Sequence, residues 1–181
     1  MCAMNTSDEI QLPLGAVLLP PQEPVATGSP QSWVALERRL GTSLPTDYKW
    51  FVSTYGAGRV EEFVWILSPF SSGHDYATAL EVELADHRSW HEMGLVDGEP
   101  DGLIPWARNE DRGTCFWDTS SGEPDRWTIV QIIEDDIRRW PDNMTTFLLK
   151  VIRGEHISDV FSHLCRYEPP LRFRTPTERM R

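Results

Sequence analysis

The sequence predicts an α+β fold, a mainly antiparallel sheet with helices packed on it, in a single domain. Two helical patterns come early, three closely spaced strand patterns follow in the second half, and another helical pattern comes after them, without regular βαβ alternation. The chain has 181 residues, of which 40% are hydrophobic and eight are tryptophan. That apolar content is enough for one sizeable core.

The first two helices are predicted at residues 30–40 and 46–55. Ser29 is a suitable N-cap, and Pro30 fits the first turn of a helix. Apolar side chains then recur at helical spacing, and each segment ends at a glycine: Trp33, Leu36, Leu40 and Gly41 in the first, Tyr48, Phe51, Tyr55 and Gly56 in the second. Because only the extended step Leu44-Pro45 separates them, we expect a helical hairpin with one shared apolar face.

The middle of the chain has one strand pattern followed by one helix pattern. Residues 60–67 are rich in β-branched and aromatic side chains and predict one strand. Residues 75–93 have apolar side chains at helical spacing, and a loop rich in glycine, proline and aspartate follows. The next three strands are predicted at residues 103–107, 114–118 and 127–133.

Short, turn-like connections join these three strands, which favours an antiparallel meander. A last helix is expected after Asp142, which can act as its N-cap, and Gly154 ends it. We expect three parts of the chain: an N-terminal lead-in at 1–29 that is partly extended, the α+β domain at 30–165, and a basic C-terminal tail at 166–181.

Charge restricts the partners of the protein. The formal net charge is −11, and residues 61–142 carry nineteen acidic and six basic side chains. Nucleic-acid binding and binding to an anionic membrane both need a basic face, so the sequence predicts neither. Three widely spaced cysteines suggest no disulfide framework, and no signal peptide or membrane span is evident. We therefore expect a cytoplasmic protein.

A search for catalytic or metal-binding patterns gives two weak candidates. His87 and His91 lie four residues apart on a predicted helix, as two zinc ligands would, but two solvated surface histidines also fit. Acidic pairs in the turns could perform acid–base chemistry only if they were desolvated, and turn residues are normally hydrated. The sequence has no phosphate loop and no nucleophile elbow, and Cys115 lies in an apolar strand. We therefore expect no enzyme and no cofactor.

Seven of the eight tryptophans fall into two groups. Five lie among apolar neighbours on predicted elements and are expected in the core: Trp33, Trp50, Trp106, Trp117 and Trp127. Trp90 and Trp140 lie among charged residues instead. Because tryptophan is frequent at interface hot spots, one of these two is a candidate binding anchor.

Five sequence blocks follow one another within residues 32–154. They are Trp33…Leu36-Glu37…Leu40-Gly41…Leu44-Pro45-x-Asp47-Tyr48-Lys49-x-Phe51…Tyr55-Gly56-x-Gly58, Gly102-Leu103-Ile104-Pro105-Trp106-Ala107, Cys115-Phe116-Trp117-Asp118, Pro124-Asp125-x-Trp127-x-Ile129-Val130 and Met144-x-x-Phe147-Leu148…Val151-Ile152-x-Gly154. In this order they resemble the SUKH superfamily, which includes the yeast cell-wall assembly regulators of Smi/Knr type. The resemblance implies an α+β fold without a catalytic triad or a metal. For bacterial members it implies immunity proteins, which bind and neutralise toxins that are often nucleases.

Two functional hypotheses follow. In the first, the chain is a bacterial immunity protein whose acidic middle covers the basic substrate cleft of a toxin domain, because opposite charges speed association and help to exclude wrong partners. Seven acidic residues are the candidate contacts: Glu110, Asp111, Glu123, Asp125, Glu134, Asp135 and Asp136. In the second, the chain is an intracellular scaffold or regulatory module that binds a host protein through an aromatic groove. Neither hypothesis specifies an oligomeric state.

Overall fold

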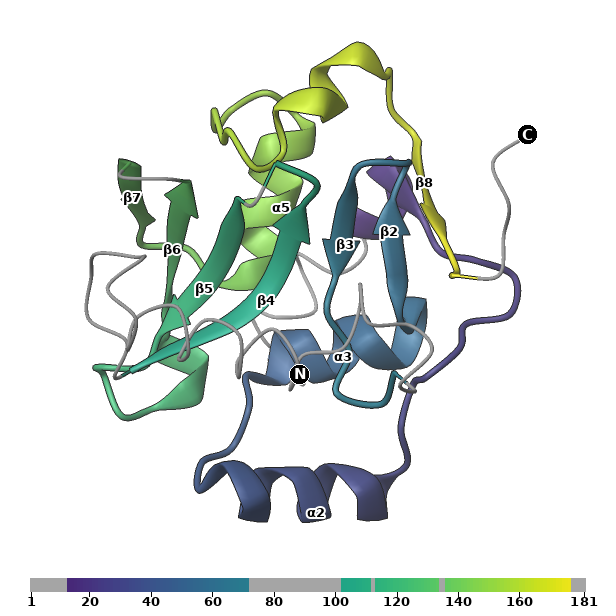
Figure 1. Cartoon of the computed structure of the whole chain (residues 1–181). Coiled ribbons are helices and arrows are strands. Elements are labelled where there is room, and N and C mark those ends of the chain that lie inside the picture. Colours follow the sequence, from purple (N-terminus) through teal and green to yellow (C-terminus); the bar gives the residue numbers. More distant parts are fainter. Residues whose placement is uncertain (1–12, 72–101, 112, 134–135, 177–181) are drawn as a thin grey trace, which may run out of the picture.

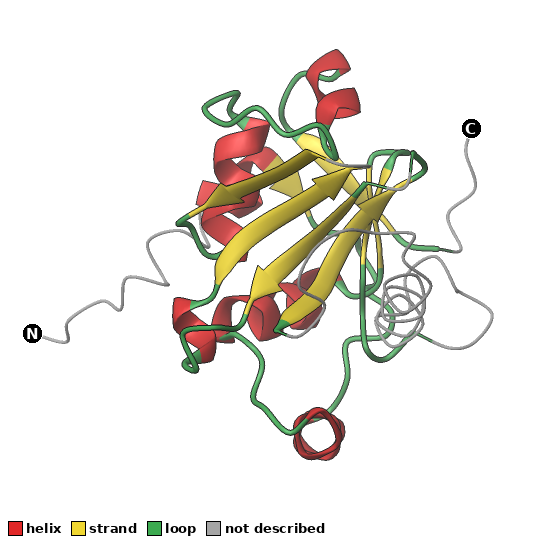
Figure 2. Cartoon of the chain, turned by 60° about the vertical axis from the view of Figure 1, so that its left-hand side comes forward, coloured by secondary structure: helices red, strands yellow, loops and turns green. Residues whose placement is uncertain are grey.

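The computed structural model describes residues 13–71, 102–111, 113–133 and 136–176. Within this part of the chain, eight strands form one sheet, antiparallel except for the parallel pair β1–β8. In sheet order they are β1 (Leu18–Leu19), β8 (Leu171–Arg174), β2 (Gly58–Val60), β3 (Val64–Ile66), β4 (Leu103–Asn109), β5 (Thr114–Asp118), β6 (Thr128–Ile133) and β7 (Asp136–Trp140). The predicted α+β class, with a mainly antiparallel sheet, is confirmed (Figures 1 and 2).

Two helices, α3 (Thr46–Tyr55) and α5 (Met144–Ile152), contact each other and pack on the sheet. The ring of Tyr48 on α3 meets Trp117 edge-on at a centroid distance of 4.7 Å, and Phe147 on α5 meets Trp106 edge-on at 6.0 Å. All four rings are fully buried. These aromatic contacts between helices and sheet form the centre of the core.

The helix α2 (Pro30–Leu40) begins as the sequence predicts. Ser29 and Ser32 form a reciprocal capping box, and Gly41 ends the helix in the left-handed conformation with φ of 73°. The helix lies apart from the sheet (Figure 2) and buries only Leu36 completely. It is attached by Trp33, which meets Phe70 edge-on at 4.6 Å, and by an ion pair of 2.5 Å between Glu37 and Lys49 of α3. The two helices thus share an edge contact and not the broad apolar face of the expected hairpin.

The single strand expected at 60–67 is wrong, because the chain reverses within it. Glu61 has φ of 51°, and residues 61–63 form the turn between β2 and β3. The backbone N–H of Glu61 donates to the carbonyl of Arg172 at 2.9 Å, and its carboxylate accepts from the N–H of Arg172 at 2.6 Å. These bonds to β8 compensate for the left-handed backbone at a buried, non-glycine residue.

Both segments that flank the expected domain of residues 30–165 contribute strands to its sheet. Leu18 of β1 and Leu171 of β8 are buried and pair in parallel. The hydroxyl of Tyr55 donates to the carbonyl of Leu18 at 2.8 Å, and the N–H of Ala57 donates to the carbonyl of Val25 at 2.8 Å. The sheet therefore extends into both the lead-in and the tail.

The tryptophans follow the predicted grouping in part. Trp106, Trp117 and Trp127 are buried, whereas Trp33 and Trp50 are partly buried and pack against the core. Trp140, one candidate anchor, is partly buried and lies 4.9 Å from Phe147 between ring centroids. The other candidate, Trp90, lies outside the described residues, as do the helix expected at 75–93 and the histidine pair at 87 and 91.

The N-cap of α5 is Asn143 and not the predicted Asp142. The side chain of Asn143 accepts from the N–H of Thr146 at 2.9 Å, which satisfies one of the free donors of the first turn. Asp142 lies one residue too early for this role and instead binds two side chains from the other end of the helix.

Candidate protein-binding surface

The structure separates the candidate acidic residues into two groups. Because β4, β5, β6 and β7 form a meander, the β4–β5 and β6–β7 turns lie at one end of the sheet and the β5–β6 loop at the other (Figure 1). Glu110, Asp111 and Asp136 lie at the first end, and Glu123 and Asp125 at the second. Glu134 and Asp135 lie outside the described residues.

The first end is built around Asn109 and Gly113. The side-chain oxygen of Asn109 accepts from the N–H of Gly113 at 2.8 Å, and its amide donates to the carbonyl of Val160 at 3.2 Å. A Cβ at position 113 would lie 2.7 Å from the side chain of Ile133 and 3.0 Å from that of Val160. Glycine at this position therefore lets the two turns and the segment around Val160 come together.

That segment adds a fourth acidic residue, Asp159. Arg138 of β7 bridges Asp136 and Asp159, with 3.0 Å between the charged atoms in each pair. His163 lies 3.3 Å from Asp111. The side chains of Asp111, Asp136 and Asp159 are 71%, 55% and 42% exposed. We name Glu110, Asp111, Asp136 and Asp159 the acidic end; these four carboxylates face solvent from three separate segments of the chain.

At the opposite end, Asp125 has a structural role that its sequence neighbours do not reveal. Its carboxylate accepts from the N–H of Thr46 at 2.7 Å and from the Thr46 hydroxyl at 3.0 Å. The residue before α3 is Pro45, whose side chain makes no cap bond, so Asp125 caps this helix from 79 residues away. Glu123 forms an exposed ion pair with Arg126, which contributes little to stability.

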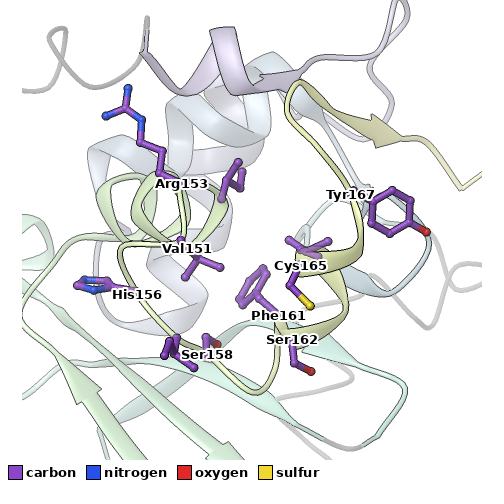
Figure 3. A pocket seen from close by; sticks show the side chains of 12 residues that line it. Val151, Arg153, His156, Ser158, Phe161, Ser162, Cys165 and Tyr167 are labelled. Atoms are coloured by element: carbon purple, nitrogen blue, oxygen red, sulfur yellow. The ribbon is translucent and has the colours of Figure 1, made fainter.

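A cavity of about 400 Å³ lies next to the segment that carries Asp159, since Ser158 is one of its lining residues (Figure 3). Its wall comes from the end of α5, the loop after it, the 3-10 helix η3 (Ser162–Arg166) and Tyr167. The volume falls in the range of small-molecule pockets, about 300–1,000 Å³. We name this cavity the C-terminal groove. No sequence motif indicated it, because it forms where the chain folds back after Gly154.

Asp142 connects both ends of α5. Its carboxylate, 10% exposed, accepts from the Lys150 ammonium at 2.6 Å and lies 2.6 Å from the Nε2 atom of His156. Burial alone would raise the pKa of Asp142, but the hydrogen bonds and charges of Lys150 and His156 outweigh burial and lower the pKa below its ordinary value of 3.8. This cluster stabilises the turn from which the C-terminal groove is built.

We expect Asp142→Asn to lower the free energy of unfolding by about 1–2 kcal/mol at neutral pH, since it weakens two charge-assisted bonds. Because the pKa of Asp142 is lowered in the folded protein, its ionised carboxylate stabilises the fold at pH values above 3.8. This stabilisation is lost as the pH falls through the folded-state pKa. The difference between wild type and variant should therefore shrink in acid. Urea unfolding between pH 7 and pH 3 measures it, with Glu155→Gln on the same loop as control. A difference that grows in acid would contradict this assignment.

Within the described residues, three or more potential metal ligands never come together, and no helix is long and apolar enough to cross a membrane. Burial raises the pKa of the Cys115 thiol well above its ordinary value, which leaves it protonated and unreactive. The described residues thus present surface charge and an apolar groove as their main binding features.

Comparison with known families agrees with this architecture. A family model described as SMI1-KNR4 cell-wall, named SUKH_6, matches residues 30–148, from the start of α2 into α5. No curated protein matches the chain. The match covers most of the chain, including all of α3 and the first part of α5, the two helices that pack against each other. The chain therefore belongs to the SUKH superfamily.

Proposed function

We propose that this protein is a bacterial immunity protein that binds a basic toxin domain in the cytoplasm and neutralises it. Membership of the SUKH superfamily supports a protein-binding domain, and SUKH domains are generally non-catalytic. The observation that carries the more specific proposal is the acidic end, where exposed carboxylates from three chain segments meet at one end of the sheet. Such a surface is complementary to the positive cleft with which a nuclease holds phosphates.

The mechanism is occlusion and involves no chemical step. The net charge of −11 attracts a basic partner from a distance of several ångströms. The acidic end then determines which side of the protein meets the partner. The partner's substrate would then be excluded by both volume and charge. The protein itself turns over nothing in this account and needs no cofactor.

The description of the matching family favours a second candidate, a regulatory module of the cell-wall assembly type. The neighbouring gene distinguishes the two candidates. A toxin gene beside this one, whose product arrests growth unless this protein is co-expressed, supports the immunity function. Absence of protection against that product contradicts it.

We expect the double variant Glu110→Lys/Asp111→Lys to slow association with that toxin domain by about tenfold at low salt. The difference should shrink at high salt, because ions screen exposed charges. Stopped-flow fluorescence measures the rate. Glu110→Lys alone and Glu123→Lys are the matched pair, since each reverses one exposed charge, at opposite ends of the sheet. Equal slowing by these two variants would show that total charge, and not the acidic end, governs association.

A further inference from the structure

We propose that the C-terminal groove receives an apolar side chain of the partner, while basic residues of the same partner segment lie over the acidic end. This inference rests on the proposed function and identifies the contact that supplies affinity for the partner. Long-range charge sets the rate of encounter, whereas an apolar anchor in a pocket usually sets how long a complex lasts.

The groove has an apolar floor. Phe161 and Leu164, which are 2% and 5% exposed, line it together with the partly buried Val151 and Ile152. Side chains such as these contribute dispersion contacts to an apolar guest and offer few hydrogen bonds to water. The groove is therefore suited to an aliphatic or aromatic side chain.

Ile157 lines the groove and is 80% exposed, the highest value among the large hydrophobic side chains that the structure describes. Gly154 has φ of 73°, and the N–H groups of Glu155 and His156 both donate to the carbonyl of Lys150, so the chain turns sharply at the end of α5. This turn leads directly to Ile157, which a bound partner would remove from water.

The charges around the groove determine what flanks the anchor. The lining includes no carboxylate; its ionisable side chains are Arg153, His156, Cys165 and Tyr167. Figure 3 shows Arg153 on one side and Ser158 and Ser162 on the other. The serine side borders the acidic end, because Asp159 follows Ser158 in the chain and His163, next to Ser162, contacts Asp111. A partner segment with an apolar residue followed by basic residues is thus complementary in both shape and charge.

Cys165 provides a test that does not require the toxin. It lines the groove and is exposed, whereas Cys115 is buried. In a Cys2→Ser background, its thiolate can attack the disulfide of a probe peptide, forming a protein–probe disulfide and releasing a small thiol. The probes are the peptides Cys-Gly-Leu-Lys-Lys, Cys-Gly-Ala-Lys-Lys and Cys-Gly-Leu-Glu-Glu, each as a mixed disulfide with cysteamine.

We call these the leucine–lysine, alanine–lysine and leucine–glutamate probes. We expect the disulfide between Cys165 and the leucine–lysine probe to persist at a concentration of 2-mercaptoethanol about fivefold higher than the disulfide with either other probe. Intact mass spectrometry measures the fraction that remains. Ile157→Ser should abolish the preference for leucine over alanine. Val34→Ser removes another exposed apolar side chain, on α2, and should leave the preference unchanged. Equal capture of the leucine and alanine probes overturns the anchor, and equal capture of the lysine and glutamate probes overturns the predicted orientation.

Failure of this inference differs from failure of the proposed function. If Ile157→Ser leaves dissociation of the toxin complex unchanged while Glu110→Lys/Asp111→Lys still slows association, the immunity function stands and the groove is not its anchor. If the protein dimerises in analytical ultracentrifugation and Ile157→Ser abolishes the dimer, a second copy occupies the groove, which also overturns the inference.

Discussion

Gly56→Ala is expected to lower the free energy of unfolding by about 4 kcal/mol, the largest effect among the substitutions considered. Gly56 has φ of 72° and ψ of −155°, a region of backbone space that essentially only glycine adopts. A Cβ there would also lie 2.1 Å from the carbonyl oxygen of Val25. Because the obstacle is backbone, no change of side-chain rotamer can relieve the overlap.

Gly41→Ala is the matched control. Gly41 also has a positive φ, 73°, but with ψ of 8° it adopts the ordinary left-handed conformation, and a Cβ there would meet nothing within 4 Å. Its replacement should cost about 1 kcal/mol. Guanidinium unfolding followed by tryptophan fluorescence measures both variants. Similar losses for the two would show that contact with Val25 contributes nothing.

The second large effect is expected at Asp47, where Asp47→Ala should cost about 3 kcal/mol at neutral pH. Its carboxylate is 5% exposed and accepts from the N–H of Tyr48 and the N–H of Thr145, both at 2.9 Å, and from the Thr145 hydroxyl at 3.2 Å. Alanine would leave two buried N–H groups without an acceptor. Since Thr145 is in the first turn of α5, this carboxylate joins α3 to α5.

A double-mutant cycle tests the contact. Thr145→Val alone removes one hydroxyl bond, and in the Asp47→Ala background the same change should cost distinctly less. Asp47→Asn keeps an acceptor oxygen and should lose less stability than Asp47→Ala. Additive effects of the Asp47 and Thr145 substitutions in urea unfolding would contradict a direct interaction.

Asp47 and Asp142 should give opposite dependences of stability on pH. Burial raises the pKa of Asp47 above 3.8, although the bonds from Thr145 and Tyr48 act against it. Because the pKa of Asp47 is raised in the folded protein, protonation of this carboxyl group adds stability that is full below 3.8 and is lost as pH rises through the folded-state value. The hydrogen bonds that Asp47 accepts from Tyr48 and Thr145 are a separate contribution, which the ionised carboxylate keeps at neutral pH. Asp142, whose pKa is lowered, gives stability that is lost in acid.

Local sequence signals predicted local structure well. Ser29, Pro30 and Gly41 mark the limits of α2 because capping depends on residues within a few positions of the helix end. The strand β7 was not predicted, since a segment containing Arg138 and Arg139 has little strand character until it pairs with β6. The reversal at Glu61 was hidden within a run of strand-forming residues.

The candidate surface was predictable only in part. The acidic character of the β4–β5 turn is evident from the sequence, and the structure places Glu110 and Asp111 in that turn. The role of Asp125 was not predictable, because its partner Thr46 is distant in sequence. Asp159 and the C-terminal groove were missed for the same reason: their proximity to the turns depends on how residues after Gly154 fold back.

The position of β8 between β1 and β2 has a consequence for the limits of this domain. The family match ends at residue 148, yet β8, which pairs with both β1 and β2, lies beyond it. Without β8, β1 would have no neighbour in the sheet and the backbone of β2 would be exposed to other chains. The segment that the family model matches is therefore shorter than the sheet, which includes strands from both outer segments.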